Sequence, residues 1–259
     1  MRKARPFRKL CVLLLKLAMN RPFLLTEKRN KPHRSDFFPP QELALTEPDG
    51  LLAIGGALSS ENLLEAYTNG IFPWYEDNQP VLWWCPKFRA VLRPDKFHVS
   101  RSLRRLIKAN RYHPSIDQSF NKVVSACAAP RNTSSNTWIT ADMQQAYGVM
   151  HELGYAHSIE IWDDSELVGG LYGISLGSIF FAESMFSFRS NTSKLALYYL
   201  TAFLNKFDFE LIDCQIINPH LKSLGVVEIT RSSFLLELSN AVRKNQSFDI
   251  WKESLLTTI

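Results

Sequence analysis

The chain has 259 residues, of which 46% are hydrophobic and 21% charged, and its net charge is +5. This composition excludes a disordered or fibrous protein, and the length suffices for a large core in one or two domains. Four widely spaced cysteines without a C-x-x-C pair exclude a disulfide framework and indicate reduced thiols, and the scattered histidines lack zinc-ligand spacing, so we expect no metal.

The positive charge is concentrated at the N-terminus. Residues 1–35 contain eleven Lys or Arg and one acid, so the remaining residues carry a net charge of −5. An apolar run follows Lys9, but Lys16 interrupts it, it is too short to span a bilayer, and no small-residue cleavage site follows. We interpret 1–35 as a basic N-terminal extension of a cytoplasmic protein without a membrane span, with export as the alternative.

A second basic stretch lies at 84–113. Nine Lys or Arg face a single acid there, Asp95. Such a block is typical of a surface that binds a polyanion. Charge alone slightly favours the other interpretation, an ordinary solvated helix face. The basic residues are Lys87, Arg89, Arg93, Lys96, Arg101, Arg104, Arg105, Lys108 and Arg111.

The first half of the chain is punctuated by Pro and Gly. Phe38, which precedes two prolines, is expected to be extended, and Pro48-Asp49-Gly50 predicts a turn. Ser59 or Ser60 can cap a helix over 61–68, which Gly70 ends. Further helices are expected at 101–110 and 119–126.

From residue 137 onward the pattern becomes α/β. Thr140 is expected to cap a helix that Gly154 closes, and Asn191 or Thr192 opens another. The strand after this second helix should run parallel to the strand before it, completing a βαβ unit. The predicted elements are a helix over 141–153, strands over 157–162, 167–174 and 178–187, a helix from 191 or 192 to 206, a strand over 210–217 and a helix over 233–244.

Acidic residues stand in two of these apolar strands. Side chains alternate along a strand, so Asp213 and Gln215 should share one face, and Cys214 should lie on the other, in the core. Both polar residues are near the carboxyl end of the strand, where open α/β sheets bind ligands. A buried carboxylate paired with an unseen Arg or Lys explains the spacing of Asp213 equally well.

Glu183 lies mid-strand between Phe181 and Met185. An acid among apolar neighbours suggests a site for a cationic group beside an apolar one, with a structural ion pair as the alternative. The glycines near residue 170 match no dinucleotide or P-loop fingerprint, and no pyrophosphate loop for coenzyme A is present. Tryptophans and a tyrosine form a dense aromatic cluster, although each one separately is more typical of packing: Trp74, Tyr75, Trp83, Trp84 and Trp138.

Short motifs run through the chain in a fixed order. They are FPP (38–40), PDGLLAIGG (48–56), LEAY (64–67), GIFPW (70–74), LWWCP (82–86), TWIT (137–140), AHSIE (156–160), GGLYG (169–173), ESMFS (183–187), LIDCQ (211–215) and SLG (223–225). In order and spacing, over about residues 37–235, they resemble the leucyl/phenylalanyl-tRNA–protein transferases, a bacterial aminoacyltransferase family. The family usually has Asp where Ala57 stands and Ser where Cys85 stands, and residues 1–35 match nothing in it.

The resemblance implies a fold and an activity. The expected fold is α+β, with a GNAT-like acyltransferase domain over 96–245, a smaller N-terminal α/β module over 36–95 and a tail over 246–259. The implied activity transfers Leu or Phe, and Met less well, from aminoacyl-tRNA to proteins with N-terminal Arg or Lys, which creates a bacterial degradation signal. The donor ester is already activated, so no cofactor is expected, and the protein should be a monomer whose partners are aminoacyl-tRNA and protein substrates.

The resemblance also implies residue roles. Asp213 would polarise Gln215, which holds the acceptor amine, and Glu183 with Asn218 would contact the acceptor peptide. Tyr67 and Trp74 would stack on the terminal adenosine of the tRNA. Phe180 and Met185 can face one pocket only if a β-bulge separates them. The aminoacyl pocket would comprise Trp138, Tyr147, Leu171, Phe180, Met185 and Ile212, and the phosphate contacts Lys87, Arg89, Arg101, Arg104, Arg105 and Lys108.

Parts of the sequence are compatible with three other functions. A nucleic-acid-binding module without catalysis would explain the two basic stretches and would make Glu183 and Asp213 dispensable. A CoA-dependent acetyltransferase is disfavoured by the missing pyrophosphate loop. A cysteine hydrolase would use Cys85 or Cys214, but no His and Asp pattern accompanies either one.

Overall fold

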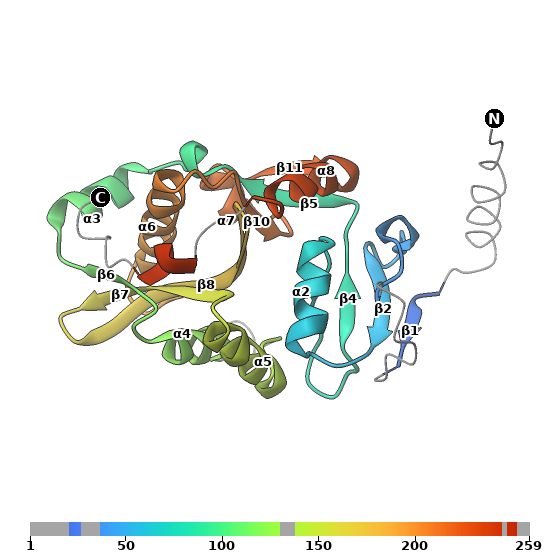
Figure 1. Cartoon of the computed structure of the whole chain (residues 1–259). Coiled ribbons are helices and arrows are strands. Elements are labelled where there is room, and N and C mark those ends of the chain that lie inside the picture. Colours follow the sequence, from blue (N-terminus) through green and yellow to red (C-terminus); the bar gives the residue numbers. More distant parts are fainter. Residues whose placement is uncertain (1–20, 27–36, 130–137, 245–247, 253–259) are drawn as a thin grey trace.

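The computed structural model describes residues 21–26, 37–129, 138–244 and 248–252. These residues form two β-sheets, and helices cover both faces of the larger one (Figure 1). The α+β class expected from the sequence is therefore confirmed. Most of the predicted extension over 1–35 and of the predicted tail over 246–259 lies outside the described residues. Within the described ranges, no helix is both long and apolar enough to cross a membrane.

The smaller sheet has four strands in the order β1-β2-β4-β3 and lies beside α2 (Figure 1). Helix α2 begins where the sequence predicts, because the Ser59 side chain accepts a hydrogen bond from the Asn62 backbone nitrogen. Gly70 follows the helix with a φ of +71°, a conformation that suits glycine. The elements are β1 (Phe23–Leu25), β2 (Leu51–Gly55), α2 (Ser60–Thr68), β3 (Phe72–Pro73) and β4 (Leu82–Trp84).

The larger sheet has seven strands in the order β11-β5-β10-β9-β8-β7-β6. The parallel pairing predicted across the helix α6 (Thr192–Lys206) is confirmed, since β9 and β10 run parallel, and the other neighbours in this sheet are antiparallel. The strands are β5 (Phe88–Leu92), β6 (His113–Ile116), β7 (Ala156–Asp163), β8 (Glu166–Leu176), β9 (Ile179–Ser187), β10 (Leu211–Gln215) and β11 (Val227–Thr230).

Helices pack on opposite faces of this sheet. Figure 1 shows α6 on one face, with α4 and α5 on the other. Because side chains alternate along the central strands, Leu171 and Phe180 join the core beneath α6, whereas Tyr172 and Phe181 join the core with α4 and α5. The helices are α3 (Arg101–Ala109), α4 (Phe120–Ala128), α5 (Ala141–Glu152), α6 (Thr192–Lys206), α7 (Pro219–Ser223) and α8 (Arg231–Ala241), with 3₁₀ turns at Gln41–Leu43, Pro94–Lys96 and Phe248–Lys252.

Strand β5 links the two sheets along the chain. It follows β4 of the small sheet within four residues, yet it pairs with β10 and β11 of the large sheet. Its residues fall inside the range predicted for the small module, 36–95. The predicted domain boundary itself stays a prediction.

Candidate active site

A β-bulge places Glu183. Ala182 stands opposite Gly173 and Ser184 opposite Tyr172, so Glu183 is the extra residue of β9 and has no partner on β8. A bulge redirects the side chains on either side of it. Residues 180 and 185 are consequently brought to the same face of the strand, which is the condition that the sequence set for a pocket containing both.

The Glu183 carboxylate is buried and accepts three hydrogen bonds. Its donors are the hydroxyl groups of Tyr67 and Tyr147 and the side-chain amide of Gln215, each at 2.8 Å. Burial raises the pKa of this carboxyl from its ordinary 4.5 to about 7, although the bonds from the two tyrosines favour the ionised form. A carboxyl group with such a pKa can take up or release a proton near neutral pH.

Asp213 is held in a sealed ion pair. Both of its carboxylate oxygens accept hydrogen bonds from the guanidinium of Arg89, at 2.8 and 2.6 Å. The side chains of Arg89 and Asp213 are 1% and 0% exposed. Asp213 is thus the buried, paired carboxylate that the sequence analysis gave as the alternative to a pocket residue. The Asp213 carboxylate does not line the pocket. The prediction that Arg89 contacts tRNA phosphates is wrong, because this charge is buried and already paired.

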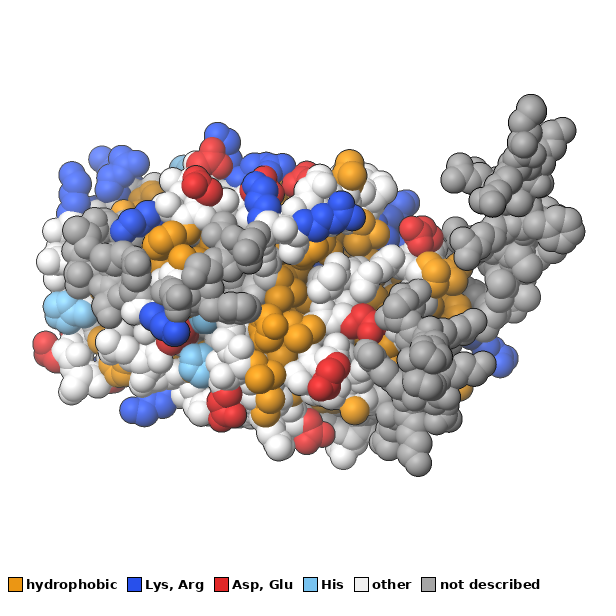
Figure 2. All heavy atoms as spheres, viewed as in Figure 1, with side chains coloured by type: hydrophobic (Ala, Val, Ile, Leu, Met, Phe, Trp, Pro, Cys, Tyr) orange, Lys and Arg blue, Asp and Glu red, His pale blue; other side chains and the backbone are white. Residues whose placement is uncertain are grey.

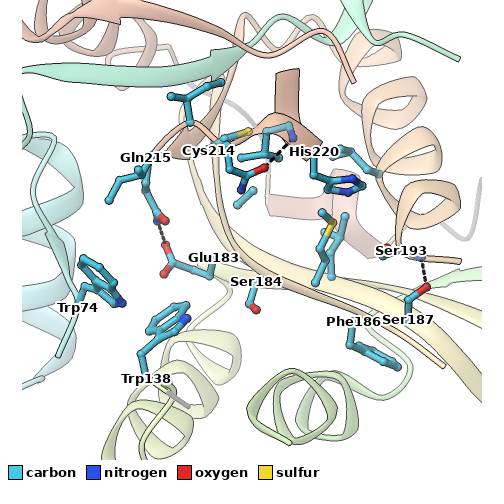
Figure 3. Close-up of a pocket in the computed structure, with 18 of the residues that line it drawn as sticks. Trp74, Trp138, Glu183, Ser184, Phe186, Ser187, Ser193, Cys214, Gln215 and His220 are labelled. Carbon is cyan, nitrogen blue, oxygen red and sulfur yellow. Dashed lines mark hydrogen bonds between the residues drawn. The ribbon is translucent and has the colours of Figure 1, made fainter. Parts of the chain in front are cut away.

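Gln215 ends β10 in a left-handed conformation. Asp213 and Gln215 stand opposite adjacent residues of β5, Val91 and Ala90, so Cys214 is an extra residue there. The prediction that Asp213 and Gln215 share a strand face is therefore wrong. Gln215 has a φ of +60°, and its backbone nitrogen donates to Asp213 Oδ1 at 2.9 Å. Asp213 thus holds the Gln215 backbone, while the side-chain amide of Gln215 reaches Glu183 (Figure 3).

A pocket of about 1020 Å³ opens beside Glu183 and Gln215. Its wall is built from the segment after α2, the ends of α4 and α6, the strands β8, β9 and β10, and α7. Figure 3 shows Trp74 and Trp138 flanking Glu183 at one end, with Ser193 and His220 at the other. Trp74 is 42% exposed, and its backbone oxygen accepts from the indole of Trp84 at 2.7 Å. Aromatic and apolar side chains thus surround one buried carboxylate.

Four residues predicted for ligand binding line this pocket as expected: Trp74, Trp138, Leu171 and Met185. Asn218 lines it too, although its side-chain oxygen caps α7 by accepting from the Leu221 backbone nitrogen.

Four others lie behind the wall. Phe180 and Ile212 are completely buried in the core, and the Phe180 ring fills the space beside Gly173, where an added Cβ would lie 2.5 Å from it. The prediction that Phe180 and Ile212 line the pocket is therefore wrong. Tyr67 is also completely buried, with its ring against Phe181, so the prediction that it stacks on an adenosine is wrong. Tyr147 is buried as well and reaches the site only through its hydroxyl.

Sequence reasoning missed some lining residues. His220 belongs to α7, a five-residue helix that the sequence analysis did not predict, although Asn218 followed by Pro219 is a helix-start pattern. Cys214 was placed wholly in the core, yet it lines the pocket, because the bulge at this position breaks the alternation.

The remaining predicted phosphate contacts are on the surface. Arg101, Arg104, Arg105 and Lys108 are exposed on α3, where Leu103 alone is buried. Lys87 is exposed as well. Figure 2 shows Lys and Arg side chains gathered along the edge that includes α3. The four α3 side chains make no ion pair with any described residue, so their charge is available to a partner.

One group of side chains outside the pocket has the composition of a metal site. Asp117, His151 and His157 come together although their spacing gave no sign of it. Each of the three already has a hydrogen-bond partner. His157 is bonded to the Asp117 carboxylate at 2.7 Å, and His151 is bonded to the backbone oxygen of Ala156 at 2.7 Å. This arrangement is that of a structural polar cluster.

The cysteine-hydrolase alternative is not supported. Burial raises the pKa of both the Cys85 and the Cys214 thiol, which disfavours the thiolate that a nucleophile requires.

The site consists of a buried carboxyl group with a raised pKa beside a largely apolar pocket at the ends of a parallel strand pair, and the enzyme class that it belongs to, the acyl-transferring enzymes, follows from the family comparison. Models described as leucyl/phenylalanyl-tRNA protein transferase and as the N-terminal domain of that transferase match residues 91–239 and 56–87. The chain belongs to this family, and with it to the aminoacyltransferases.

Individual relatives agree. The chain is 46% identical over 225 residues to the leucyl/phenylalanyl-tRNA–protein transferase of Psychromonas ingrahamii, covering 87% of this chain and 94% of the relative. It is 54% identical over 197 residues to that of Azoarcus sp. strain BH72, covering 76% and 84%. A solved structure titled GCN5-related N-acetyltransferase from Kribbella flavida is 11% identical, with a TM-score of 0.34 over 61% of this chain and 56% of that one. A TM-score this low carries no argument about the fold of this chain, and the GNAT-like expectation stays a prediction.

Proposed function

We propose that the protein transfers Leu or Phe, and Met less well, from aminoacyl-tRNA to the α-amino group of proteins whose first residue is Arg or Lys. The observation that carries the proposal is the hydrogen-bonded pair of Glu183 and Gln215 at the wall of an apolar pocket. Family membership supports the coarser reaction, aminoacyl transfer from tRNA to protein.

The apolar walls suit the donor side chain. The pocket wall is flexible or flat at Leu171, Met185 and Trp138. A side chain that is unbranched at Cβ, such as that of Leu, Phe or Met, can pack against this wall. Trp74, which is half exposed at the mouth, offers a face on which the terminal adenosine of the tRNA can stack. The donor would thus bind between the two tryptophans.

The reaction is aminolysis of an ester. The acceptor nitrogen forms a bond to the aminoacyl carbonyl carbon, the bond from that carbon to the ribose oxygen breaks, and the ribose oxygen leaves with a proton. The acceptor must first lose a proton from its ammonium. Glu183, with a pKa of about 7, can receive that proton, while the side-chain oxygen of Gln215 can accept a hydrogen bond from the amine.

Alignment supplies much of the rate. Holding a bound amine against a bound ester can contribute roughly 7–11 kcal/mol of the barrier without a nucleotide cofactor. Glu183 forms no ion pair with any described residue, so its negative charge can attract the ammonium or the Arg or Lys side chain of the acceptor.

The exposed basic residues of α3 fit the tRNA. Arg101, Arg104, Arg105 and Lys108 would contact phosphates of the acceptor stem, giving sequence-tolerant and salt-sensitive binding. We further propose that the transferred residue marks the product for degradation. A cytoplasmic location and a monomeric state stay predictions.

The direct test mixes purified protein, tRNA charged with labelled leucine, and a peptide that begins with Arg. The expected product is the peptide extended by one labelled leucine. A matched peptide with an acetylated N-terminus should remain unlabelled, because it lacks the nucleophilic amine. Leucine released only as the free amino acid, or equal labelling of both peptides, would contradict the proposal. A parallel incubation with acetyl-CoA tests the acetyltransferase alternative, and acetylation of the peptide would favour it.

A further inference from the structure

Arg89 is the most completely engaged charged side chain near the pocket. Its guanidinium donates two hydrogen bonds to Asp213 and a third to the Gly70 backbone oxygen, at 3.1 Å. The rings of Phe72 and Phe234 lie on it, each centroid 4.6 Å away. All three nitrogens are used and the planar face is covered, so the group is fixed in one orientation.

A continuous chain of hydrogen bonds connects Arg89 with Glu183. Arg89 fixes the Asp213 carboxylate, and Asp213 Oδ1 accepts the Gln215 backbone N–H at 2.9 Å. That bond secures Gln215 at its positive φ, which non-glycine residues rarely adopt unless a local interaction holds them. The side chain that leaves this backbone then donates to Glu183.

We propose that Arg89 is a positioning residue for the transfer reaction: through Asp213 it holds the turn at Gln215 that directs the Gln215 amide to Glu183. The inference rests on the proposed function. Arg89 touches neither substrate, because it is 1% exposed and does not line the pocket. Its action is on geometry.

Only arginine satisfies this arrangement. A lysine would keep the positive charge but would replace a planar fork, with parallel bonds to both carboxylate oxygens, by a single point donor. Asp213 could then rotate, and the Gln215 backbone would lose its fixed acceptor. Arg89→Lys therefore separates the geometric role from the charge.

Kinetics of Arg89→Lys provide the test, with labelled Leu-tRNA and the Arg peptide as substrates. A displacement of about 1 Å at a reacting group can cost on the order of 10²-fold in rate, so we expect kcat to fall by one to two orders of magnitude. The KM for Leu-tRNA should change little, because the pocket wall remains. Arg231→Lys is the matched control, since Arg231 also donates to backbone oxygens, those of Pro86 and Gln41, away from the pocket.

The pH profile distinguishes positioning from mere stability. Loss of the Gln215 donor removes a bond that favours ionised Glu183, so the acidic limb of kcat should move to higher pH in Arg89→Lys and stay in place in Arg231→Lys. The groups facing Glu183 are Tyr67 from α2, Tyr147 from α5 and Tyr172 from β8, with the charges of Asp213 and Arg89 farther away. Since the substituted side chain would still carry a positive charge, a shifted limb reports the altered hydrogen bond.

The outcomes separate the two claims. A wild-type protein that makes no labelled peptide defeats the proposed function. An active wild type together with wild-type kcat and pH limb in Arg89→Lys defeats the positioning role, whatever the loss of thermal stability. Should circular dichroism show Arg89→Lys to be unfolded, Asp213→Asn applies the same test, because it keeps the volume and Arg89 while removing the charge-assisted pairing. Because this change also removes a negative charge that raises the pKa of Glu183, the variant is judged by kcat and KM rather than by its pH limb. Its kcat should fall while the KM for Leu-tRNA changes little, and wild-type kcat in a folded variant rejects the proposal.

Discussion

The Gln215 amide nitrogen donates to Glu183 Oε1 at 2.8 Å, joining the extra residue of the β9 bulge to the last residue of β10. The two strands are the parallel pair of the large sheet. Both residues owe their direction to an irregularity, a bulge for Glu183 and a positive φ for Gln215. The end of the pocket that holds Glu183 is thus built where regular strand geometry stops.

Glu183→Gln should abolish most transfer while the protein stays folded. Glutamine has the same shape but cannot receive a proton, so we expect kcat for labelled peptide formation to fall by about 10²–10⁴-fold. Glu166→Gln is the control, because Glu166 is exposed and paired with Arg189 on the surface. Wild-type turnover by a folded Glu183→Gln protein would exclude Glu183 from the chemistry.

Stability should depend on pH through Glu183. Its pKa is about 7 in the folded protein and ordinarily 4.5, so the unfolded chain loses this proton first as the pH rises. The wild type therefore loses stability between about pH 4.5 and 7, by an amount on the order of 3 kcal/mol. Glu183→Gln lacks this loss. Urea unfolding at pH 4.5 and pH 8 should show the free energy of unfolding of the variant rising relative to that of the wild type, and a constant difference between the two proteins would contradict the raised pKa.

Removing a tyrosine donor should make Glu183 harder to ionise. Tyr67→Phe and Tyr147→Phe each delete a hydrogen bond that favours the carboxylate, so the acidic limb of the kcat profile should move to higher pH. Tyr172→Phe is a matched control. Its hydroxyl is buried and has no hydrogen-bond partner in the described structure, so its removal should leave the limb in place and should not cost stability. Equal shifts in all three variants would refute this assignment.

Charge reversal on α3 should weaken tRNA binding. Arg104→Glu together with Arg105→Glu should raise the Kd and lower the steepness of its salt dependence by roughly two phosphate contacts. Arg111→Glu is the control from the same basic stretch, because Arg111 is already paired with Asp163 at 2.6 Å. Filter binding of tRNA across a salt series measures both effects. An unchanged salt slope in the double variant would remove α3 from the tRNA interface.

Local signals predicted most of the helix starts and the central strands of the large sheet. Ser59, Ser100 and Thr140 each accept from the backbone nitrogen three residues on, and each begins a helix within a residue of the predicted start. Alternating apolar residues located β7, β8 and β9 within about two residues of their bounds. No strand was predicted in the small sheet, and β5, β6 and β11 of the large sheet were missed as well. These strands are two to five residues long and show no clear alternation, and β5, β6 and β11 pair with strands 40 or more residues away.

The site was only partly predictable. An acid in an apolar strand identified Glu183 and Asp213, but it could not reveal that Asp213 would find its partner 124 residues away. Arg89 looked like any other member of a basic stretch, because burial depends on the packing of Phe72 and Phe234 around it. The two bulges reversed the alternation on which the assignment of strand faces depended, and no residue pattern marked them.

Glu183 takes one of its donors, Tyr67, from α2 beside the small sheet, and the other two from α5 and β10. Neither half of the described polypeptide therefore holds all the hydrogen-bond donors of Glu183. A displacement of the N-terminal half by the length of one hydrogen bond would break the bond from Tyr67 and raise the pKa of Glu183 further. The same displacement would move Trp74 away from the pocket. Under the proposed function, docking of the two halves is therefore also the step that completes the active site.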